Sequence, residues 1–192
     1  MERKNSKPKR IAVFSDTHGN KLPMRQAIDE LGPFDMIMHL GDGTLDGKAV
    51  AEEFSIPFRG IAGNEDLGQG LPETQSVTIS KWPFYLIHGF QTEAVHHKGE
   101  QARERHINRL CRIAEQKKAR VILTGHTHEP LLKKAHGIIL CNPGDQHMGS
   151  SSPPTFALIR VSEAELDISV MKRDGKKKWA ALVNSNFQAA GT

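Results

Sequence analysis

The chain has 192 residues, the length of one ordinary domain, and its 38% apolar content is enough to form a buried core. The formal net charge of +4 comes entirely from residues 1–10, which hold five basic residues and one acid. Because basic and acidic residues balance in the rest of the chain, no domain-wide field favours a polyanion, which argues against a nuclease and against a nucleic-acid partner.

The first half of the chain alternates predicted strands and helices at short intervals. The expected strands cover residues 10–15, 35–40 and 56–62, and the expected helices cover about 20–31 and 46–54. Apolar residues repeat at helical spacing from Met24 to Leu31, and Gly32 and Pro33 end that helix. This β-α-β-α-β order predicts parallel strands joined by right-handed crossovers.

After residue 70 the pattern changes to paired strands. Strands over 74–80 and 82–87 are separated by little more than Lys81, which predicts antiparallel pairing in a second sheet. A helix follows over about 99–118, then strands over 121–124, 137–141 and 155–161, and a hairpin of 166–173 and 179–183 around Asp174-Gly175. We therefore expect a single domain over residues 10–183, between a disordered basic tail (1–9) and a loose C-terminal tail (184–192).

Two further features bear on location. No apolar run approaches the roughly 20 residues that a membrane span needs, and no apolar segment follows the basic N-terminus as it would in a secretory signal. The two cysteines, Cys111 and Cys141, lie in apolar patterns, which predicts buried free thiols in a reducing compartment rather than a disulfide. The expected location is the cytoplasm, with no membrane partner.

Short clusters of metal-seeking residues stand at the ends of five strand-like runs. They are Asp16-Thr17-His18, Gly41-Asp42, Gly63-Asn64, His88-Gly89 and Gly125-His126-Thr127-His128. Each cluster alone is a weak signal, since a Gly-Asp after a strand is most often a turn. Open α/β sheets place their sites at the carboxyl ends of strands, so the five clusters together predict seven N and O ligands at one edge and hence two metal ions.

This predicted pair of metal ions determines the expected chemistry. Two divalent ions ~3.5 to 4 Å apart hold and deprotonate a shared water, and they stabilise the oxygens of a phosphoryl group during in-line displacement. A carboxylate can bridge such ions, while neutral imidazole and amide oxygen complete each sphere without adding charge. The predicted chemistry is therefore phosphoester hydrolysis. Because imidazoles must be neutral to bind metal, metal affinity and activity should fall below about pH 6.

The ordered motifs resemble those of the calcineurin-like metallophosphoesterase superfamily. With Asp66 after Gly63-Asn64 and a later Asn142-Pro143-Gly144, the similarity covers about residues 10–170. Chain length and spacing are similar to those of its small bacterial and archaeal phosphodiesterase branch, to which the eukaryotic retromer scaffold subunit is related. The resemblance implies an α/β fold in which two mixed β-sheets form a sandwich flanked by α-helices.

Carried onto this chain, the resemblance implies a role for each motif residue. Asp16, His18 and His128 would hold the first metal, Asn64, His88 and His126 the second, and Asp42 would bridge the two. Catalytic roles fall to Asn64, whose amide nitrogen can donate to the substrate phosphate, and to Asp66, which orients the loop or a ligand. The implied cofactors are two Mn²⁺ ions, and the same mixed ligand set also suits Fe, Ni, Co or Zn.

The implied function is that of a dinuclear metal-dependent phosphodiesterase, which hydrolyses small phosphodiesters by in-line attack of a metal-bridging hydroxide. The alternative is a protein-binding scaffold on the same fold, similar to the retromer subunit, which has lost part of its ligand set. A homo-oligomer is a further option, because Trp179 and Leu182 in the final hairpin can either contact another subunit or complete the core.

Three positions depart from the superfamily pattern. Glu65 stands where many members have a His that protonates the leaving oxygen, so it is either an acid with a raised pKa or a solvated loop carboxylate. Phe90 stands where a polar residue often follows the His-Gly motif, and Asp145 stands where Ser is usual. Either of these changes can reshape the substrate pocket.

The remaining histidines are interpreted mainly as structural. His39 is expected in the core and His106 and His136 at the surface. His96 and His97 are expected in a surface loop with substrate contact as the alternative, and a place at the rim of the site is the alternative for His147. The many Arg and Lys residues of the predicted 99–118 helix are expected to form a solvated face, with attraction of an anionic substrate as the alternative.

Overall fold

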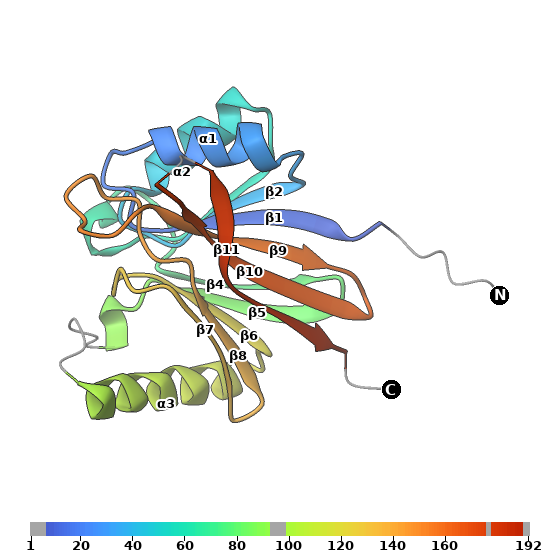
Figure 1. Ribbon diagram of the computed structural model, residues 1–192. Coiled ribbons are helices and arrows are strands. Elements are labelled where there is room, and N and C mark those ends of the chain that lie inside the picture. The colour runs from blue at the N-terminus through green and yellow to red at the C-terminus, as the bar shows by residue number, and fades with distance from the viewer. Residues whose placement is uncertain (1–6, 93–98, 176–177, 190–192) are drawn as a thin grey trace.

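Two β-sheets lie face to face, and helices cover their outer faces (Figure 1). The computed structural model describes residues 7–92, 99–175 and 178–189. One sheet has six strands in the order β11-β10-β9-β1-β2-β3, and the other has five in the order β4-β5-β6-β8-β7. Each sheet contains parallel and antiparallel pairs, which confirms the expected sandwich of two mixed sheets.

The six-stranded sheet joins the first three strands of the chain to the last three. Its strands are β1 (Lys9–Phe14), β2 (Met36–His39), β3 (Phe58–Gly60), β9 (Thr155–Val161), β10 (Glu165–Arg173) and β11 (Trp179–Gln188). β1, β2 and β3 are parallel, and the helices α1 (Leu22–Leu31) and α2 (Thr44–Glu53) connect them, as the alternating pattern predicted. A short 3₁₀ turn, η1 (Asn64–Asp66), follows β3.

The five-stranded sheet is formed by the middle of the chain. Its strands are β4 (Thr74–Ile79), β5 (Trp82–Ile87), β6 (Val121–Thr124), β7 (Leu131–Ala135) and β8 (Ile138–Asn142). β4 and β5 pair antiparallel, as predicted, whereas β5, β6 and β8 are parallel. The 3₁₀ turn η2 (Phe90–Thr92) and the helix α3 (Glu100–Gln116) lie between β5 and β6 in the chain.

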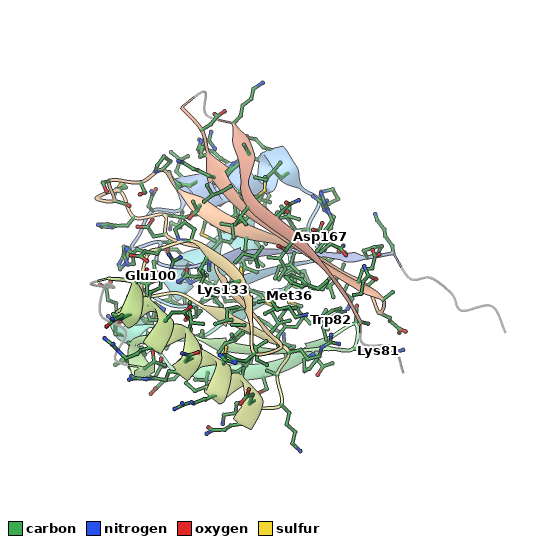
Figure 2. The ribbon with its side chains drawn as sticks, turned by 60° about the horizontal axis from the view of Figure 1, so that its bottom comes forward. Met36, Lys81, Trp82, Glu100, Lys133 and Asp167 are labelled. Atoms are coloured by element: carbon green, nitrogen blue, oxygen red, sulfur yellow. The ribbon has the colours of Figure 1, made fainter. Side chains whose placement is uncertain are left out.

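The core has three layers. The central layer lies between the sheets and includes the fully buried Trp82, with Met36 packed against it (Figure 2). A second layer packs α1 and α2 on the six-stranded sheet. The third packs the predicted apolar stripe of α3 on the five-stranded sheet, through Ile107, Leu110 and Cys111 among others. Cys111 and Cys141 are buried free thiols, as expected.

The C-terminal end of the sheet corrects one prediction. Residues 184–188 were expected in a loose tail, but β11 continues to Gln188 and pairs with β10 along that length. Val183 and Phe187 pack against the central layer, so alternate side chains hold the strand on the core. At the other end, Lys9 begins β1 rather than belonging to the tail, and residues 1–6 lie outside the described part of the chain.

Other expectations are corrected by burial and pairing. The sequence did not predict β7, which pairs antiparallel with β8. His106 was expected at the surface, but it is buried within hydrogen-bond distance of the Thr92 hydroxyl, 3.4 Å away. Trp179 completes the core against Phe156, with ring centroids 4.8 Å apart, whereas Leu182 remains exposed. Within the described residues, no helix has the length and apolar character required to cross a membrane.

Candidate metal centre

The seven predicted ligands lie in the loops that leave five strands of the two sheets. Asp16 and His18 follow β1, Asp42 follows β2, Asn64 opens η1 after β3, His88 follows β5, and His126 and His128 follow β6. Six of them form two groups whose ligand atoms lie within 4.8 Å of one another. The sheet edge predicted from the motifs therefore gathers carboxylate and imidazole groups that come from distant parts of the sequence.

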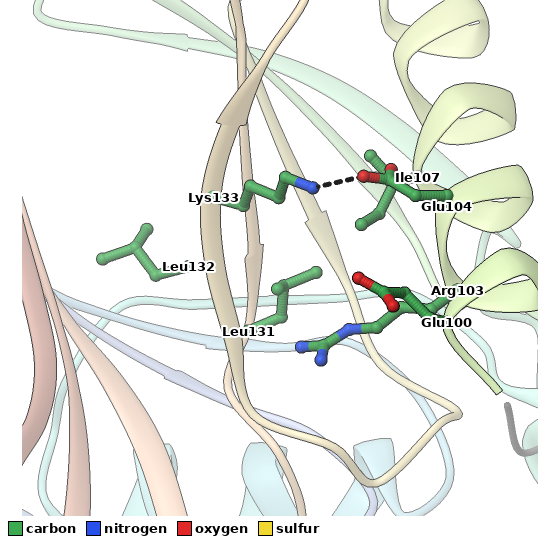
Figure 3. A pocket seen from close by; sticks show the side chains of 7 residues that line it. All are labelled: Glu100, Arg103, Glu104, Ile107, Leu131, Leu132 and Lys133. Carbon is green, nitrogen blue, oxygen red and sulfur yellow. Dashed lines mark hydrogen bonds and ion pairs between the residues drawn. The ribbon is translucent and has the colours of Figure 1, made fainter.

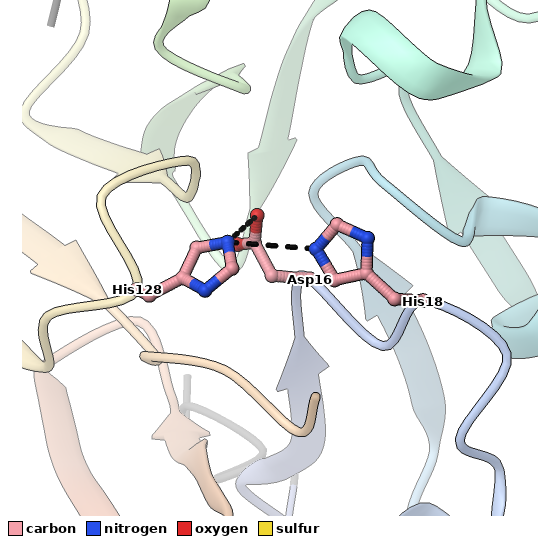
Figure 4. Close-up of side chains that lie close together, drawn as sticks. All are labelled: Asp16, His18 and His128. Carbon is pink, nitrogen blue, oxygen red and sulfur yellow. Dashed lines mark hydrogen bonds and ion pairs between the residues drawn. The ribbon is translucent and has the colours of Figure 1, made fainter. Parts of the chain in front are cut away.

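The first group consists of Asp16, His18 and His128 (Figure 4). Nε2 of His128 lies 3.3 Å from Oδ1 of Asp16 and 3.5 Å from Nε2 of His18. The two rings approach Asp16 from opposite sides, one from the end of β1 and one from the end of β6 (Figure 4). Two imidazole nitrogens and one carboxylate oxygen thus converge, which is a donor set that a divalent metal can occupy.

The second group consists of Asp42, His88 and His126. Nδ1 of His88 donates to the Leu40 carbonyl at 2.7 Å, which directs Nε2 of the same ring to Oδ2 of Asp42, 3.3 Å away. Asp42 also forms a third such group with His18 and Glu65. Its carboxylate is therefore close to His18 of the first group as well as to its own two imidazoles, the position that a bridging ligand needs.

Two buried polar atoms at this edge indicate that a cation fits the site. Among the described residues, neither Oδ1 of Asp16 nor Nε2 of His88 has a hydrogen-bond partner, and the two atoms lie 3.8 Å apart. Leaving buried polar atoms unpaired is costly unless a ligand completes them. A metal ion bound by both atoms would satisfy them together, so these residues fit the ions that the sequence predicted.

The carboxylates of the site remain ionised despite their burial. Burial alone would raise the pKa of Asp16, but His128 and His88 outweigh it and lower that pKa below its ordinary value. Burial opposes ionisation of Asp42 in the same way, and His88 together with the Glu65 amide lowers the pKa of Asp42. Both side chains therefore carry negative charge in the metal-free centre.

The imidazoles respond to this negative charge. Contacts with Asp145 and Asp16 raise the pKa of His128 to about 10. Burial would lower the pKa of His88, but Asp42 and Asp16 raise it overall. Burial, reinforced by nearby His88, lowers the pKa of His126. Without metal, a proton on His128 partly offsets the charge of the carboxylates, and a divalent ion would take over that task.

The local backbone explains why these residue types stand here. Five of the seven predicted ligands have positive φ angles, namely Asp16 (54°), His18 (45°), Asp42 (54°), His126 (68°) and His128 (58°). This left-handed region is uncommon for residues with a Cβ atom, and strain of this kind clusters at functional sites. The adjoining glycines allow close approach: a Cβ on Gly125 would lie 2.0 Å from Oγ of Ser15, and one on Gly63 2.1 Å from Oδ1 of Asp42.

The two predicted catalytic residues occupy different environments. Asn64 is exposed at the start of η1, in the loop after β3. Asp66 is buried and accepts hydrogen bonds from the amides of Gly43 (3.1 Å) and Gly63 (3.0 Å) and from the Thr44 hydroxyl (3.0 Å). Asp66 therefore ties the loop after β3 to the loop after β2.

The structure gives Glu65 and Asp145 partners that the sequence did not predict. Oε2 of Glu65 lies 2.9 Å from Nδ1 of His18, and Oδ2 of Asp145 lies 3.0 Å from Nδ1 of His128. Asp145 is buried, whereas the Glu65 side chain is 59% exposed. Because Glu65 is so exposed, burial cannot make it the missing acid. The only sequence signal for either pairing was the departure of both positions from the superfamily pattern.

Aromatic rings form the rim of the centre. The His147 ring lies 5.0 Å from that of His18, so His147 lies at the rim, which the sequence offered only as an alternative. The Phe90 ring lies 6.1 Å from that of His88. His39 is confirmed as a core residue, since it is buried within 3.2 Å of the Thr17 hydroxyl. His136 is exposed, as expected, and His96 and His97 lie outside the described residues.

A separate cavity of about 260 Å³ lies between α3 and β7 (Figure 3). Its lining residues are Glu100, Arg103, Glu104, Ile107, Leu131, Leu132 and Lys133. An ion pair of 2.8 Å between Lys133 and Glu104 crosses it (Figure 3). None of the seven predicted ligands lines this cavity, so it is distinct from the metal centre.

Comparison with known proteins finds a family model that matches most of the chain. The model of the calcineurin-like phosphoesterase superfamily domain matches residues 10–164. A protein of Methanothermobacter thermautotrophicus named "Probable metallophosphoesterase" is 26% identical over 168 residues, which cover 84% of this chain and 91% of that protein.

Solved structures share the fold at low sequence identity. Zn²⁺-bound Vps29 of Entamoeba histolytica has a TM-score of 0.71 and 20% identity, over 93% of this chain and 98% of that chain. A structure described as a novel archaeal phosphodiesterase has a TM-score of 0.54 and 22% identity, over 94% of this chain and 99% of that chain. These likenesses extend across nearly the whole chain and concern its fold.

Proposed function

Because the chain belongs to the calcineurin-like phosphoesterase superfamily, we propose that it is a metal-dependent phosphoesterase that acts chiefly on small phosphodiesters. The observation that carries this proposal is the pair of ligand groups at one sheet edge, with Asp42 within reach of both. Carboxylates and imidazoles in this arrangement suit two divalent ions better than any purely structural role, since buried Asp16 and His88 atoms lack hydrogen-bond partners among the described residues.

We assign each ligand to one of two ions. Asp16, His18 and His128 would hold the first ion, Asn64, His88 and His126 would hold the second, and Asp42 would serve both. When bound, such ions activate a water molecule and neutralise the charge that develops on a phosphoryl group. Mn²⁺ is our first choice, and the Zn²⁺-bound Vps29 shows that a relative in fold accepts another divalent ion.

The chain's own residues then bind and orient the ester. The exposed Asn64 amide can donate to a phosphoryl oxygen when its own oxygen faces the second ion. Asp66 holds the Asn64 loop against the loop that carries Asp42, through its bonds to Gly43 and Gly63. The His147 ring lies beside His18 and the Phe90 ring beside His88, so both rings are near enough to contact an ester at the centre.

Glu65 bears on which esters react. Its exposed carboxylate faces His18 rather than a leaving oxygen, so the protein lacks the usual His that protonates the departing alcohol. Esters whose leaving groups are stable as anions should therefore be cleaved best. The fold shared with an archaeal phosphodiesterase favours diesters over monoesters. The free, buried Cys111 and Cys141 agree with a reducing compartment, and we propose the cytoplasm.

A protein-binding scaffold is the second candidate, because the fold is also that of Vps29, one of whose structures contains a bound cyclic peptide. The chain retains the complete predicted ligand set, which favours an enzyme. The test is hydrolysis of bis-p-nitrophenyl phosphate and p-nitrophenyl phosphate by metal-stripped protein reloaded with Mn²⁺, beside Asp42→Ala. We expect Mn²⁺-dependent diester cleavage that this variant lacks. No turnover with any divalent ion, despite two bound metals, would favour the scaffold.

A further inference from the structure

Two carboxylates touch the outer nitrogens of the first-site imidazoles without belonging to the proposed ligand set. Glu65 contacts Nδ1 of His18 at 2.9 Å, and Asp145 contacts Nδ1 of His128 at 3.0 Å. We propose that these two carboxylates are positioning residues for the first ion, and that they make its site the tighter of the two. This inference rests on the proposed function only in that it requires the centre to bind metal.

Carboxylates stand at ion-pair distance from both nitrogens of the His128 ring. Nδ1 faces Asp145, and this leaves Nε2 directed at Oδ1 of Asp16, 3.3 Å away. A metal-binding imidazole commonly has its other nitrogen held by a carboxylate or carbonyl, which fixes the orientation of the ring and increases its basicity as a ligand. Asp145 is in the position that such a partner requires.

The loop around Asp145 is itself anchored, so the carboxylate cannot shift freely. The Asn142 amide nitrogen donates to the Gly125 carbonyl and to the Thr127 hydroxyl, both at 3.0 Å. The Asp145 carbonyl accepts from the Thr155 amide at 3.0 Å, and the Gln146 amide donates to the Asp16 carbonyl at 3.2 Å. These bonds connect the loop to the turn that carries His128 and to the strand end that carries Asp16.

Glu65 makes the weaker of the two contacts because its side chain is 59% exposed. Its backbone amide nevertheless donates to Oδ1 of Asp42 at 2.9 Å. Glu65 therefore joins His18 of the first site to the proposed bridging residue. Water competes for an exposed carboxylate, so we expect its removal to matter less than removal of the buried Asp145.

The second site lacks this support. Nδ1 of His88 is held at 2.7 Å by the Leu40 carbonyl, which is a neutral acceptor. Within the described residues, the His126 ring has contacts with other rings, such as that of His88, but no hydrogen-bond partner. A neutral acceptor increases imidazole basicity less than a carboxylate does. The two ions should therefore bind in sequence, the first site filling before the second.

The experiment is calorimetric titration of Mn²⁺ into metal-free wild type, Asp145→Ala, Asp145→Asn, Glu65→Gln and Glu129→Gln. Glu129→Gln is the matched control, because Glu129 is an exposed carboxylate directly after His128. We expect two affinity classes in the wild type. Asp145→Ala should weaken the tight class by about 10–100-fold and leave the weak class unchanged. Asp145→Asn and Glu65→Gln should weaken it less, and Glu129→Gln should not change it.

Two further variants assign the classes, since His88→Ala should keep the tight class and His128→Ala should keep only the weak one. An unchanged tight class in both Asp145 variants would overturn the inference. Equal weakening of both classes would also overturn it, because that result indicates a general loosening of the centre. If Asp145→Ala does not fold, the Mn²⁺ affinity of the tight class in Asp145→Asn still tests the inference. Wild-type protein that binds no Mn²⁺ would contradict the proposed function itself.

Discussion

The metal centre and the cavity beside α3 both gather charged side chains, but the charges differ in burial and pairing. At the centre, the side chains of Asp16 and His88 are completely buried, and their facing atoms have no hydrogen-bond partner among the described residues. Beside α3, Lys133 and Glu104 form a direct ion pair while 40% and 52% exposed. Exposed pairs of this kind need nothing further, whereas buried, incompletely paired charges require a ligand.

The presence of a cavity therefore does not identify the functional site. The space between α3 and β7 is a well-defined hollow, yet its ion pair is complete and its helix face is solvated, as the sequence predicted for the basic helix. The sheet edge is recognised instead by positive φ angles at five ligands and by buried carboxylates that stay ionised. Variants that remove equivalent groups from each region can test this comparison.

The largest effect is expected from removing one carboxylate charge in each region. Asp16→Asn should lower kcat for bis-p-nitrophenyl phosphate by at least about 10²–10³-fold, because Asp16 lies between His88 and His128 at the centre. Glu104→Gln removes the same charge from the α3 cavity and should leave kcat unchanged. Steady-state kinetics at saturating Mn²⁺ compares the two. Equal losses in both variants would show that the contrast between the regions is false.

A smaller effect is expected from glycine replacements. Gly125→Ala would place a Cβ 2.0 Å from Oγ of Ser15 and 2.8 Å from Oδ2 of Asp16, so the loop or the ligand must move. We expect a loss of about 1–3 kcal/mol in the free energy of unfolding, from urea denaturation of the metal-free protein. Gly175→Ala is the control, since a Cβ there would meet no described atom within 4 Å. Its stability should change by less than about 0.5 kcal/mol, and a similar loss in both variants would contradict close packing at Gly125.

A further effect is a pH dependence of metal affinity. Contacts with Asp145 and Asp16 raise the pKa of His128 to about 10, so this ring is protonated at pH 7 in the metal-free protein. Since only the neutral ring binds metal, first-site affinity should rise about tenfold per pH unit between pH 7 and 9. With ordinary imidazoles, metal affinity is expected to decline only below about pH 6. Because the pKa of His128 is raised, this decline in affinity should begin at a higher pH.

Proton release on metal binding tests directly whether His128 is protonated in the metal-free protein. Titration of Mn²⁺ at pH 7 in two buffers with different heats of protonation should show about one or more protons released with the first ion. The exposed pair beside α3 contributes nothing to this value. A binding enthalpy that is the same in both buffers would mean that His128 is already neutral in the metal-free protein. The electrostatic difference between the metal centre and the exposed pair beside α3 would then be contradicted.

The sequence predicted the parts of the fold that repeat locally. Alternating apolar strands and helices determined the parallel β1-β2-β3 unit, and the stripe of α3 follows from helical spacing. β7 was missed because its two lysines interrupt the apolar pattern of a core strand. None of its residues is fully buried. The end of β11 was missed because polar Asn184, Ser185 and Asn186 interrupt the apolar pattern between Val183 and Phe187, whose side chains pack against the core.

The same limit explains what the sequence predicted of the site. Ligand types follow strands in a fixed order, so the seven candidates could be named before their contacts were known. Partners that are distant in sequence leave no local pattern: Glu65 meets His18 across 47 positions, and Asp145 meets His128 although β7 and β8 lie between them in the chain. The burial of His106 escaped prediction similarly, because Thr92 approaches it from another segment.

The central claim is that two ions sit between the ligand groups at this edge, with Asp42 in contact with both. Anomalous diffraction at the manganese edge, from crystals grown with Mn²⁺, tests it most directly. We expect two anomalous peaks, with the Asp42 carboxylate between them. One peak should lie next to Asp16, His18 and His128, and the other next to Asn64, His88 and His126. Peaks elsewhere, or a centre without manganese at saturating concentration, would contradict it.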